Sequence, residues 1–205
     1  DENDLTPSKE ALEHSLTLNP GLTRAYFYLA VIYWLMGDDA GSDECLENAR
    51  SGGLDYLAES FDYMREKREE NTRFFGNATD TLTYALDGVA LSGMYLEFGV
   101  NYGGSIRFIA SKTDHVVNGF DSFEGIPEDW GNEKKGSYST YGQLPEVPQN
   151  VVLHQGWFSD TLPPFMEEND ESVAFANIDC DLYSSTKDVF DNIGDRVKKD
   201  SVLIF

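Results

Sequence analysis

Short apolar runs and helical stretches alternate along the second half of the sequence. The apolar runs lie at 94–98, 116–120, 151–154, 173–178 and 201–205, and each has the length of one strand. Continuous apolar strands separated by helical segments are typical of a parallel sheet that is covered on both faces. The pattern therefore predicts an α/β domain over 71–205, with a further helix at 82–91 leading into its first strand.

The first third of the chain has a different pattern and predicts helices from about residue 8 to residue 70. Ser8 is a candidate N-cap of a first helix that runs to Leu16. The segment 19–21 interrupts this pattern, and apolar positions at helical spacing resume at Ala25. We therefore expect a helical region over 1–70, followed by the α/β domain.

This helical region resembles a tetratricopeptide repeat. A large-large-small-aromatic pattern, a glycine turn and a second helix follow one another at Tyr26, Leu29, Ala30, Tyr33, Gly37, Leu46 and Ala49. Ser42 departs from the repeat pattern, which usually has alanine there. Repeat units bury their apolar faces against neighbours, so the resemblance implies packing on the next domain, on a protein partner or on further repeats. A helical extension that only covers hydrophobic surface is the alternative.

Composition limits the partners. The 205 residues carry a net charge of −22, which argues against nucleic acid or an anionic membrane as the main partner. No apolar run approaches the roughly 18 residues of a membrane-spanning helix. Cys45 and Cys180 fall in different predicted regions, so a disulfide framework is not expected. We expect a cytoplasmic protein, because a reducing compartment is the default for such cysteine usage.

Candidate chemistry is concentrated where four predicted strands end, at Glu97, Asp121, Gly156 and Asp179. Ligands of parallel sheets bind beyond the carboxyl ends of the strands. A glycine-rich turn, 99–105, follows the first strand and leads into a helix, which is how backbone N–H groups approach a nucleotide-like ligand. The sequence therefore predicts a ligand site at these strand ends.

A long polar segment, 122–150, connects the second and third strands. Loops of this length in a compact domain are usually functional. We interpret it as part of a lid or substrate wall.

Five motifs together resemble the macrocin O-methyltransferase family, S-adenosylmethionine-dependent enzymes of the Rossmann-like class, some of which methylate sugar hydroxyls on macrolides. The resemblance covers about 85–205 and rests on Leu96–Val100, Gly103–Ser105, Gly119–Pro127, Gly156–Pro163 and Ile178–Thr186. It implies a Rossmann-like methyltransferase domain that uses S-adenosylmethionine and a small-molecule hydroxyl acceptor.

The resemblance also assigns cofactor contacts. Glu97 and the turn that contains Gly99, Gly103 and Ser105 would lie beside the amino-acid tail and the sulfonium, where an acid favours a cation and glycines permit close approach. Asp121 would accept hydrogen bonds from both ribose hydroxyls.

Four further residues are assigned to the ribose and adenine end of the cofactor. Ser122 would add a polar contact next to the ribose, and Gly156, Trp157 and Phe158 would border the adenine. Two alternatives stay open: Asp121 as a helix N-cap, and the two aromatic residues as ordinary core packing.

Asp179 is the candidate catalytic residue. In the resembled family, the acid after the fourth strand binds Mg²⁺ beside the acceptor hydroxyl, so Asp179 would act as metal ligand and base, with Asp181 as a second metal ligand. A cap on the following helix is the alternative for Asp181.

One departure from the family concerns the metal. Family members carry a further acidic pair directly after the fifth strand, and this sequence stops on that strand at Phe205. We therefore expect weak or no Mg²⁺ binding and little turnover by this chain, with cofactor binding retained. The exposed sheet edge that this implies favours self-association into a homo-oligomer.

The leading hypothesis is an S-adenosylmethionine-dependent O-methyltransferase acting on a sugar or small-molecule hydroxyl, with Mg²⁺ assistance in the full-length protein. A nicotinamide-dependent oxidoreductase is the first alternative, because an acid after the second strand also suits the NAD ribose. A scaffold that binds proteins through its helical region, with an inactive α/β domain, is the second.

Overall fold

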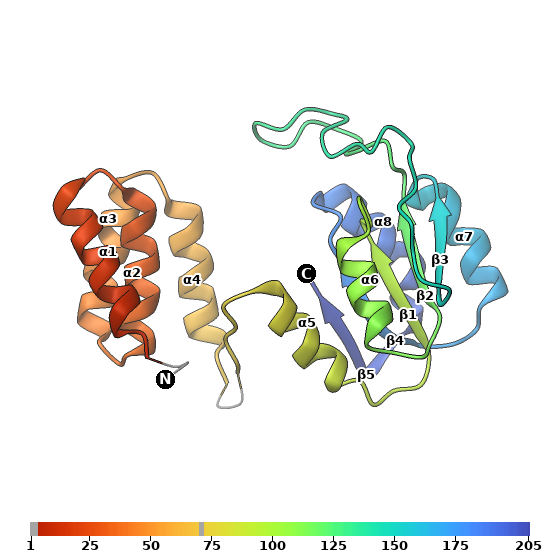
Figure 1. The fold of residues 1–205 in the computed structure, drawn as a ribbon, viewed down its shortest axis with the longest axis horizontal. Coiled ribbons are helices and arrows are strands. Elements are labelled where there is room, and N and C mark those ends of the chain that lie inside the picture. Colours follow the sequence, from red (N-terminus) through yellow and green to blue (C-terminus); the bar gives the residue numbers. More distant parts are fainter. Residues whose placement is uncertain (1–3, 70–71) are drawn as a thin grey trace. The chain divides into compact units, whose positions relative to one another are not determined.

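The computed structural model describes residues 4–69 and 72–205, which form two compact units, Asp1–Phe74 and Phe75–Phe205 (Figure 1). The boundary expected from the sequence, between 70 and 71, lies outside the described residues. The first unit is helical and the second is an α/β unit, as the two patterns predict.

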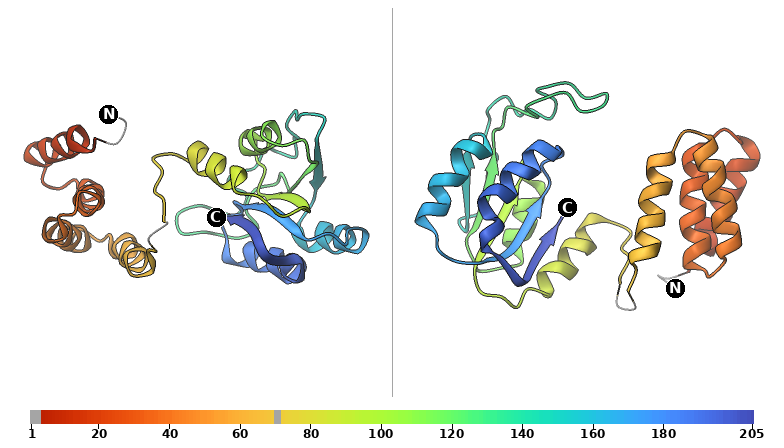
Figure 2. Two further views of the ribbon diagram at one scale, coloured as in Figure 1. Left: turned by 90° about the horizontal axis from the view of Figure 1, so that it is seen from below. Right: turned by 180° about the vertical axis from the view of Figure 1, so that it is seen from behind.

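The helical unit consists of four helices of equal length: α1 (Thr6–Leu18), α2 (Thr23–Leu35), α3 (Asp39–Ser51) and α4 (Asp55–Lys67). They lie side by side in chain order (Figure 2, left). A small core forms where they meet, with Leu29, Ala30, Leu46, Ala58 and Phe61 buried. The expectation that Ser8 caps the first helix is wrong. The helix begins at Thr6, because the fixed φ of Pro7 suits a first helical turn.

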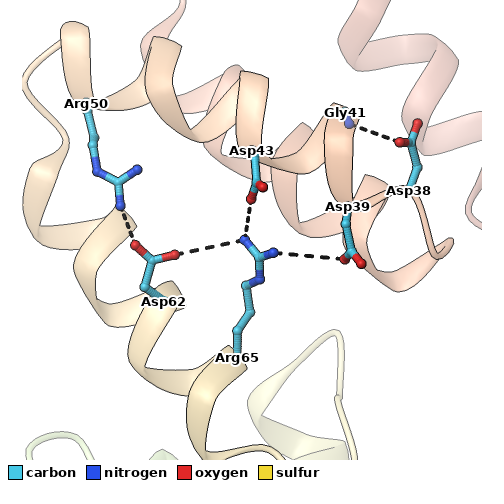
Figure 3. Close-up of polar contacts among 7 residues, drawn as sticks. All are labelled: Asp38, Asp39, Gly41, Asp43, Arg50, Asp62 and Arg65. Carbon is cyan, nitrogen blue, oxygen red and sulfur yellow. Dashed lines mark hydrogen bonds and ion pairs between the residues drawn. The ribbon is translucent and has the colours of Figure 1, made fainter.

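Ion pairs join α3 to α4 on the surface of the helical unit. Figure 3 shows Arg65 of α4 reaching Asp43 and Asp39 of α3, with Nη–Oδ1 distances of 2.7 Å and 3.9 Å. Asp62 of α4 pairs with Arg50 and lies 3.9 Å from Arg65. Each of these aspartates therefore has a cationic side-chain partner. The resemblance of this unit to a tetratricopeptide repeat stays a prediction.

The α/β unit follows the expected alternation of strands and helices. Its elements are α5 (Ala78–Asp87), β1 (Met94–Phe98), α6 (Gly104–Ser111), β2 (Val117–Asp121), β3 (Val151–Gln155), α7 (Phe158–Glu168), β4 (Val173–Ile178), α8 (Tyr183–Ile193), a 3₁₀ turn (Gly194–Arg196) and β5 (Val197–Ile204). All strand pairs are parallel, in the order β3-β2-β1-β4-β5. This is the order of a doubly wound Rossmann-like sheet, and it confirms the predicted fold class.

Apolar side chains on both faces of the sheet explain why the strands are continuously hydrophobic. Alternate residues of β1 point to opposite faces. Tyr95 packs in one cluster with Ile106 and Ile109 of α6. Leu96 and Phe98 pack in a second cluster with residues of α7 and α8. The sheet is therefore the middle of three layers, and its central strand β1 is fully buried.

The connection between β2 and β3 differs from the others. Residues 122–150, all of them described, contain turns and an isolated bridge between Trp130 and Glu133, but no helix. The last part of this loop runs along α6: Arg107 donates to the Glu146 carbonyl (3.1 Å), and Asn150 donates to the Ala110 carbonyl (2.9 Å). The first part extends beyond the carboxyl ends of the strands (Figure 1).

Two elements begin earlier than the sequence predicts. The helix before β1 starts at Ala78, where the Asn77 side chain accepts from the Asp80 N–H (2.9 Å) and caps it. The last strand starts at Val197. Both cysteine thiols are free, in separate units. Within the described residues, no helix has the length and hydrophobicity needed to cross a membrane.

Candidate functional site

A cavity of about 750 Å³ opens at the carboxyl ends of the central strands. Its walls come from the turn after β1, the tip of β2, the long loop, the start of α7, and the segment from the tip of β4 into α8. Its size falls within the range of about 300–1,000 Å³ that is typical of small-molecule sites. It lies where the strand order of the sheet reverses, between β1 and β4, which is the position at which doubly wound sheets bind ligands.

Backbone contacts at Gly99 hold the strand ends together. The Gly99 N–H donates to the Phe120 carbonyl (3.0 Å), and the Asp179 N–H donates to the Phe98 carbonyl (2.8 Å). Gly99 has φ +92°, and a Cβ there would lie 2.0 Å from the Asp179 carbonyl oxygen. Only glycine fits this position, so the sequence motif reflects a close approach of two chain segments.

Asp121 fastens this turn to β2. Its Oδ2 accepts from the N–H groups of Val100 and Asn101, both at 2.8 Å, and its Oδ1 accepts from the Phe123 N–H at 2.7 Å. The N-cap alternative is wrong, because no helix follows β2 in the described loop. A carboxylate has about four acceptor positions, so three backbone bonds leave about one. The expectation that Asp121 accepts from both ribose hydroxyls is therefore reduced to one such bond.

Glu97 is the fully buried acid beneath this turn. Its Oε1 accepts from the Asn177 amide on β4 (2.9 Å), and its Oε2 is buried without a hydrogen-bond partner among the described residues. Burial raises the pKa of Glu97 to about 7, the Ser105 hydroxyl and the Asn177 amide oppose this rise, and the charges of Asp179 and Asp121 add to it. An ionisable group held in this way is ready for a cation or a hydrogen-bond donor.

Asn101 is a site residue that the sequence reasoning missed, although it lies within the turn already singled out. It adopts φ +49°, lines the cavity, and its buried Oδ1 lacks a partner within the described part of the chain. Asparagine tolerates the left-handed conformation, so an asparagine within a glycine-rich turn is a weak indication in the sequence of such a backbone position. Asn101 thus has an unused buried acceptor at the cavity wall, and Glu97 has one beneath the same turn.

The predicted adenine-side residues occur together at the start of α7. Trp157 precedes the helix, Phe158 is its first residue, and both line the cavity with Gly156. Phe158 also packs edge-on against Phe98, with ring centroids 5.8 Å apart. Phe158 is therefore both a cavity wall and part of the core packing. Ser122 also lines the cavity and accepts from the Glu124 N–H (3.1 Å).

Asp179 and Asp181 follow β4 and both line the cavity. The interpretation of Asp181 as a helix cap is wrong. Leu182 occupies the N-cap position of α8, and Asp181 adopts φ +60° before it. Such a conformation is costly for a residue with a side chain and is often found at functional sites. Burial, and then the charge of Asp179, raises the pKa of Asp181.

A metal site is not assembled by these residues. Within 4–69 and 72–205, no group of three or more histidine, cysteine, aspartate or glutamate side chains is placed to hold an ion. Asp179 and Asp181 alone do not make the ligand set that the resemblance implies.

The long loop contributes the remaining wall, as its length predicted. Gly125, Ile126, Trp130 and Tyr138 of this loop line the cavity. Ser184 of α8 donates to the Glu128 carboxylate (2.6 Å) and links the loop to the helix across the site.

Nine of the eleven predicted site residues line the cavity. Two do not: Glu97 lies buried under the turn, and Gly103 is the residue before α6, with φ +75°. Sequence reasoning did not single out Trp130, Tyr138 or Asp188 of α8, which also line it. Trp130 and Tyr138 lie in the loop that the sequence predicted as part of a lid or substrate wall, which did not single out individual residues, whereas Asp188 lies on a helix face that only the fold brings to the cavity.

Residues 96–205 match the family model described as a methyltransferase domain. The crystal structure of CalS11, a calicheamicin methyltransferase, is similar with a TM-score of 0.51 and 25% sequence identity, over 62% of this chain and 61% of that one. An apo structure of CalS11, described as a TDP-rhamnose 3'-O-methyltransferase, has a TM-score of 0.45 and 25% identity.

The chain thus spans about 61% of the length of the CalS11 chain to which it is similar. No curated protein matches the sequence significantly.

Proposed function

The chain belongs to the methyltransferase-domain family, and from this membership we propose that it transfers a methyl group from S-adenosylmethionine to a hydroxyl group of a sugar or similar small molecule. The observation that supports this most is the arrangement of Glu97 and Asn101. Each has a buried acceptor without a partner among the described residues; Asn101 lines the cavity of about 750 Å³ at the strand ends, and Glu97 lies beneath the same turn. Similarity to a calicheamicin methyltransferase supports the choice of a hydroxylated acceptor.

The residues present fit the cofactor. Gly104 in the turn after β1 lines the cavity with open space beside it, so a ligand can approach the backbone there. Glu97 favours a cationic group, and one acceptor position of Asp121 is left for a ribose hydroxyl. Trp157 and Phe158 offer aromatic surface to a purine. When bound, S-adenosylmethionine supplies a methyl group on a positively charged sulfur.

The chain's own residues would orient the acceptor and accept its proton. Asp179 directly follows β4 and is exposed to the cavity, so it is our proposed base for the acceptor hydroxyl. Asp181 lies next to it, and its raised pKa makes it a second proton acceptor. The aromatic loop residues would exclude water and hold the acceptor against these carboxylates.

The magnesium assistance expected from the resemblance has only Asp179 and Asp181 to support it, and no step above depends on a metal. Family membership favours methyl transfer over the nicotinamide-dependent alternative.

Calorimetric titration with S-adenosylhomocysteine tests the proposed function. We expect saturable binding to the wild-type chain, and we expect Asp121→Asn to weaken it about tenfold, since a lost charged hydrogen bond costs roughly 1.5–3 kcal/mol. Asp129→Asn, in the long loop that follows β2 and paired with Lys134, is the control and should bind like wild type. Binding of NAD in place of S-adenosylhomocysteine would refute the proposal.

A further inference from the structure

The charge of the cavity wall limits which acceptors the site can hold. Four aspartates line it: Asp121, Asp179, Asp181 and Asp188. Among the described residues, no lysine, arginine or histidine lines it. Lys134 of the long loop and Lys187 of α8 pair with Asp129 and Asp191, which do not line the cavity. A phosphate or carboxylate on the acceptor would therefore be repelled by these four carboxylates and would meet no lining cation among the described residues.

Three of these aspartates lie on the side that the cofactor does not explain. The backbone N–H groups of three residues already surround Asp121, and Glu97 lies below the turn. Asp179, Asp181 and Asp188 instead line the wall formed by the tip of β4 and by α8. Three carboxylates on one wall attract a positively charged group.

Aromatic side chains of the long loop also line this cavity. Trp130 and Tyr138 remain 46% and 49% exposed, so their rings are available to a bound molecule. Tryptophan and tyrosine faces attract ammonium groups as well as apolar surface. The carboxylates of the β4–α8 wall and the aromatic rings of the loop thus both favour a ligand that carries an ammonium group.

We propose that the acceptor is a hydroxylated amine, such as an amino sugar, and that the site excludes phosphorylated sugars. This inference rests on the proposed function, because it concerns the acceptor of the same site. Its basis is the joint placement of Asp179, Asp181 and Asp188 with Trp130 and Tyr138 around one cavity without a lining cation among the described residues.

The test compares three ligands that share one sugar skeleton: glucosamine, glucose and glucose phosphate. Each is titrated into the full chain saturated with S-adenosylhomocysteine, by ligand-observed NMR, in EDTA and again with Mg²⁺. We expect glucosamine to bind at least about tenfold more tightly than glucose phosphate, with glucose between them, which corresponds to about 1.4 kcal/mol. Equal or tighter binding of glucose phosphate, in either buffer, overturns the inference.

Matched variants localise the effect. Asp188→Asn should weaken glucosamine about threefold and leave glucose unchanged, in line with a partly exposed charge contact. Asp191→Asn lies on the same helix but pairs with Lys187, and should change neither. Trp130→Ala and Tyr138→Ala should each weaken glucosamine, whereas Tyr141→Ala, in the same loop and 90% exposed, should not. If both loop variants bind like wild type, the aromatic part of the inference is wrong.

The two proposals fail separately. If S-adenosylhomocysteine does not bind while the chain alone still prefers glucosamine, the proposed function is wrong and the cavity chemistry stands. If S-adenosylhomocysteine binds but the preference is absent, only the acceptor inference is wrong.

Discussion

Three surface aspartates of the helical unit and the acids at the strand ends of the α/β unit differ in their partners. On the helical unit, Asp39, Asp43 and Asp62 each face an arginine of α3 or α4 (Figure 3). In the α/β unit, Asp121 is held by backbone N–H groups alone, and Glu97 keeps one buried oxygen without a partner among the described residues. Arginines thus neutralise these surface aspartates of the helical unit, whereas the acids at the strand ends of the α/β unit have no cationic partner among the described residues and stay available for a ligand.

This comparison teaches that the number of acids says little about function, whereas their partners say much. The net charge of −22 gave no indication of which carboxylates matter. Exposed ion pairs contribute little stability, typically below about 1 kcal/mol each. A buried carboxylate without a cation costs more, and proteins keep such groups mainly where they bind or react.

The largest expected effect comes from removing the close approach that builds the site. Gly99→Ala places a Cβ 2.0 Å from the Asp179 carbonyl oxygen at a φ of +92°. We expect the free energy of unfolding of the α/β unit to fall by roughly 3–5 kcal/mol in urea titrations followed by circular dichroism. Gly104→Ala is the control, because a Cβ there meets nothing within 4 Å. Equal stability of the two variants would show that the strand ends are not locked at Gly99.

The second effect is a pH dependence caused by Glu97, whose pKa burial raises from 4.5 to about 7. Between these values the folded chain keeps a proton that the unfolded chain has lost, so stability falls as pH rises through this window. The expected loss is about 3 kcal/mol, measured as the change in unfolding free energy. Glu97→Gln should remove this slope, and Glu124→Gln on the exposed loop should keep it. A slope that survives Glu97→Gln must come from another group.

A third, smaller effect follows from the backbone contacts of Asp121. Asp121→Asn loses the charge and replaces one acceptor oxygen by a donor, so at least one of its three N–H partners stays unpaired. We expect a loss of about 2 kcal/mol in unfolding free energy, in addition to the weaker S-adenosylhomocysteine binding. A variant as stable as wild type would mean that Asp121 does not hold the turn.

The smallest effect is expected for the paired acids of the helical unit. Asp62→Asn removes a partner of Arg50 and Arg65, yet its side chain is 49% exposed. The expected cost is below about 1 kcal/mol and should shrink further in high salt. If Asp62→Asn were as damaging as Asp121→Asn, the contrast between the two units would disappear.

The sequence predicted the elements of the α/β unit closely, because continuous apolar strands and glycine turns are local signals. Met94–Phe98 and Val173–Ile178 have the expected bounds. Helix starts were predicted less well: Thr6 and Ala78 begin their helices earlier than the apolar pattern does, since the first turn of a helix needs no apolar face.

Residues of the site were predictable where they lie within a strand-end motif. Asp121 and Asp179 belong to such motifs, whereas Trp130 and Asp188 come from a loop and a helix face that only the fold brings to the cavity. The partners of Asp121 were also unpredictable, because a carboxylate that follows a strand can serve a helix, a ligand or a turn. Tertiary placement decides among these three.

The strand order has a consequence for how the chain folds. β1 is the central strand, and it pairs with β4, where Asn177 donates to Glu97, a residue 80 positions earlier in the sequence. Contacts in the helical unit are closer in sequence: they join consecutive helices, and Phe61 of α4 also packs against Phe27 and Trp34 of α2. Contacts between residues far apart in the sequence form slowly, and parallel sheets depend on them. During synthesis we therefore expect α1–α4 to fold before β1 can pair with β4. Until β4 emerges from the ribosome, the cavity lacks the wall that Asp179 and Asp181 form after this strand.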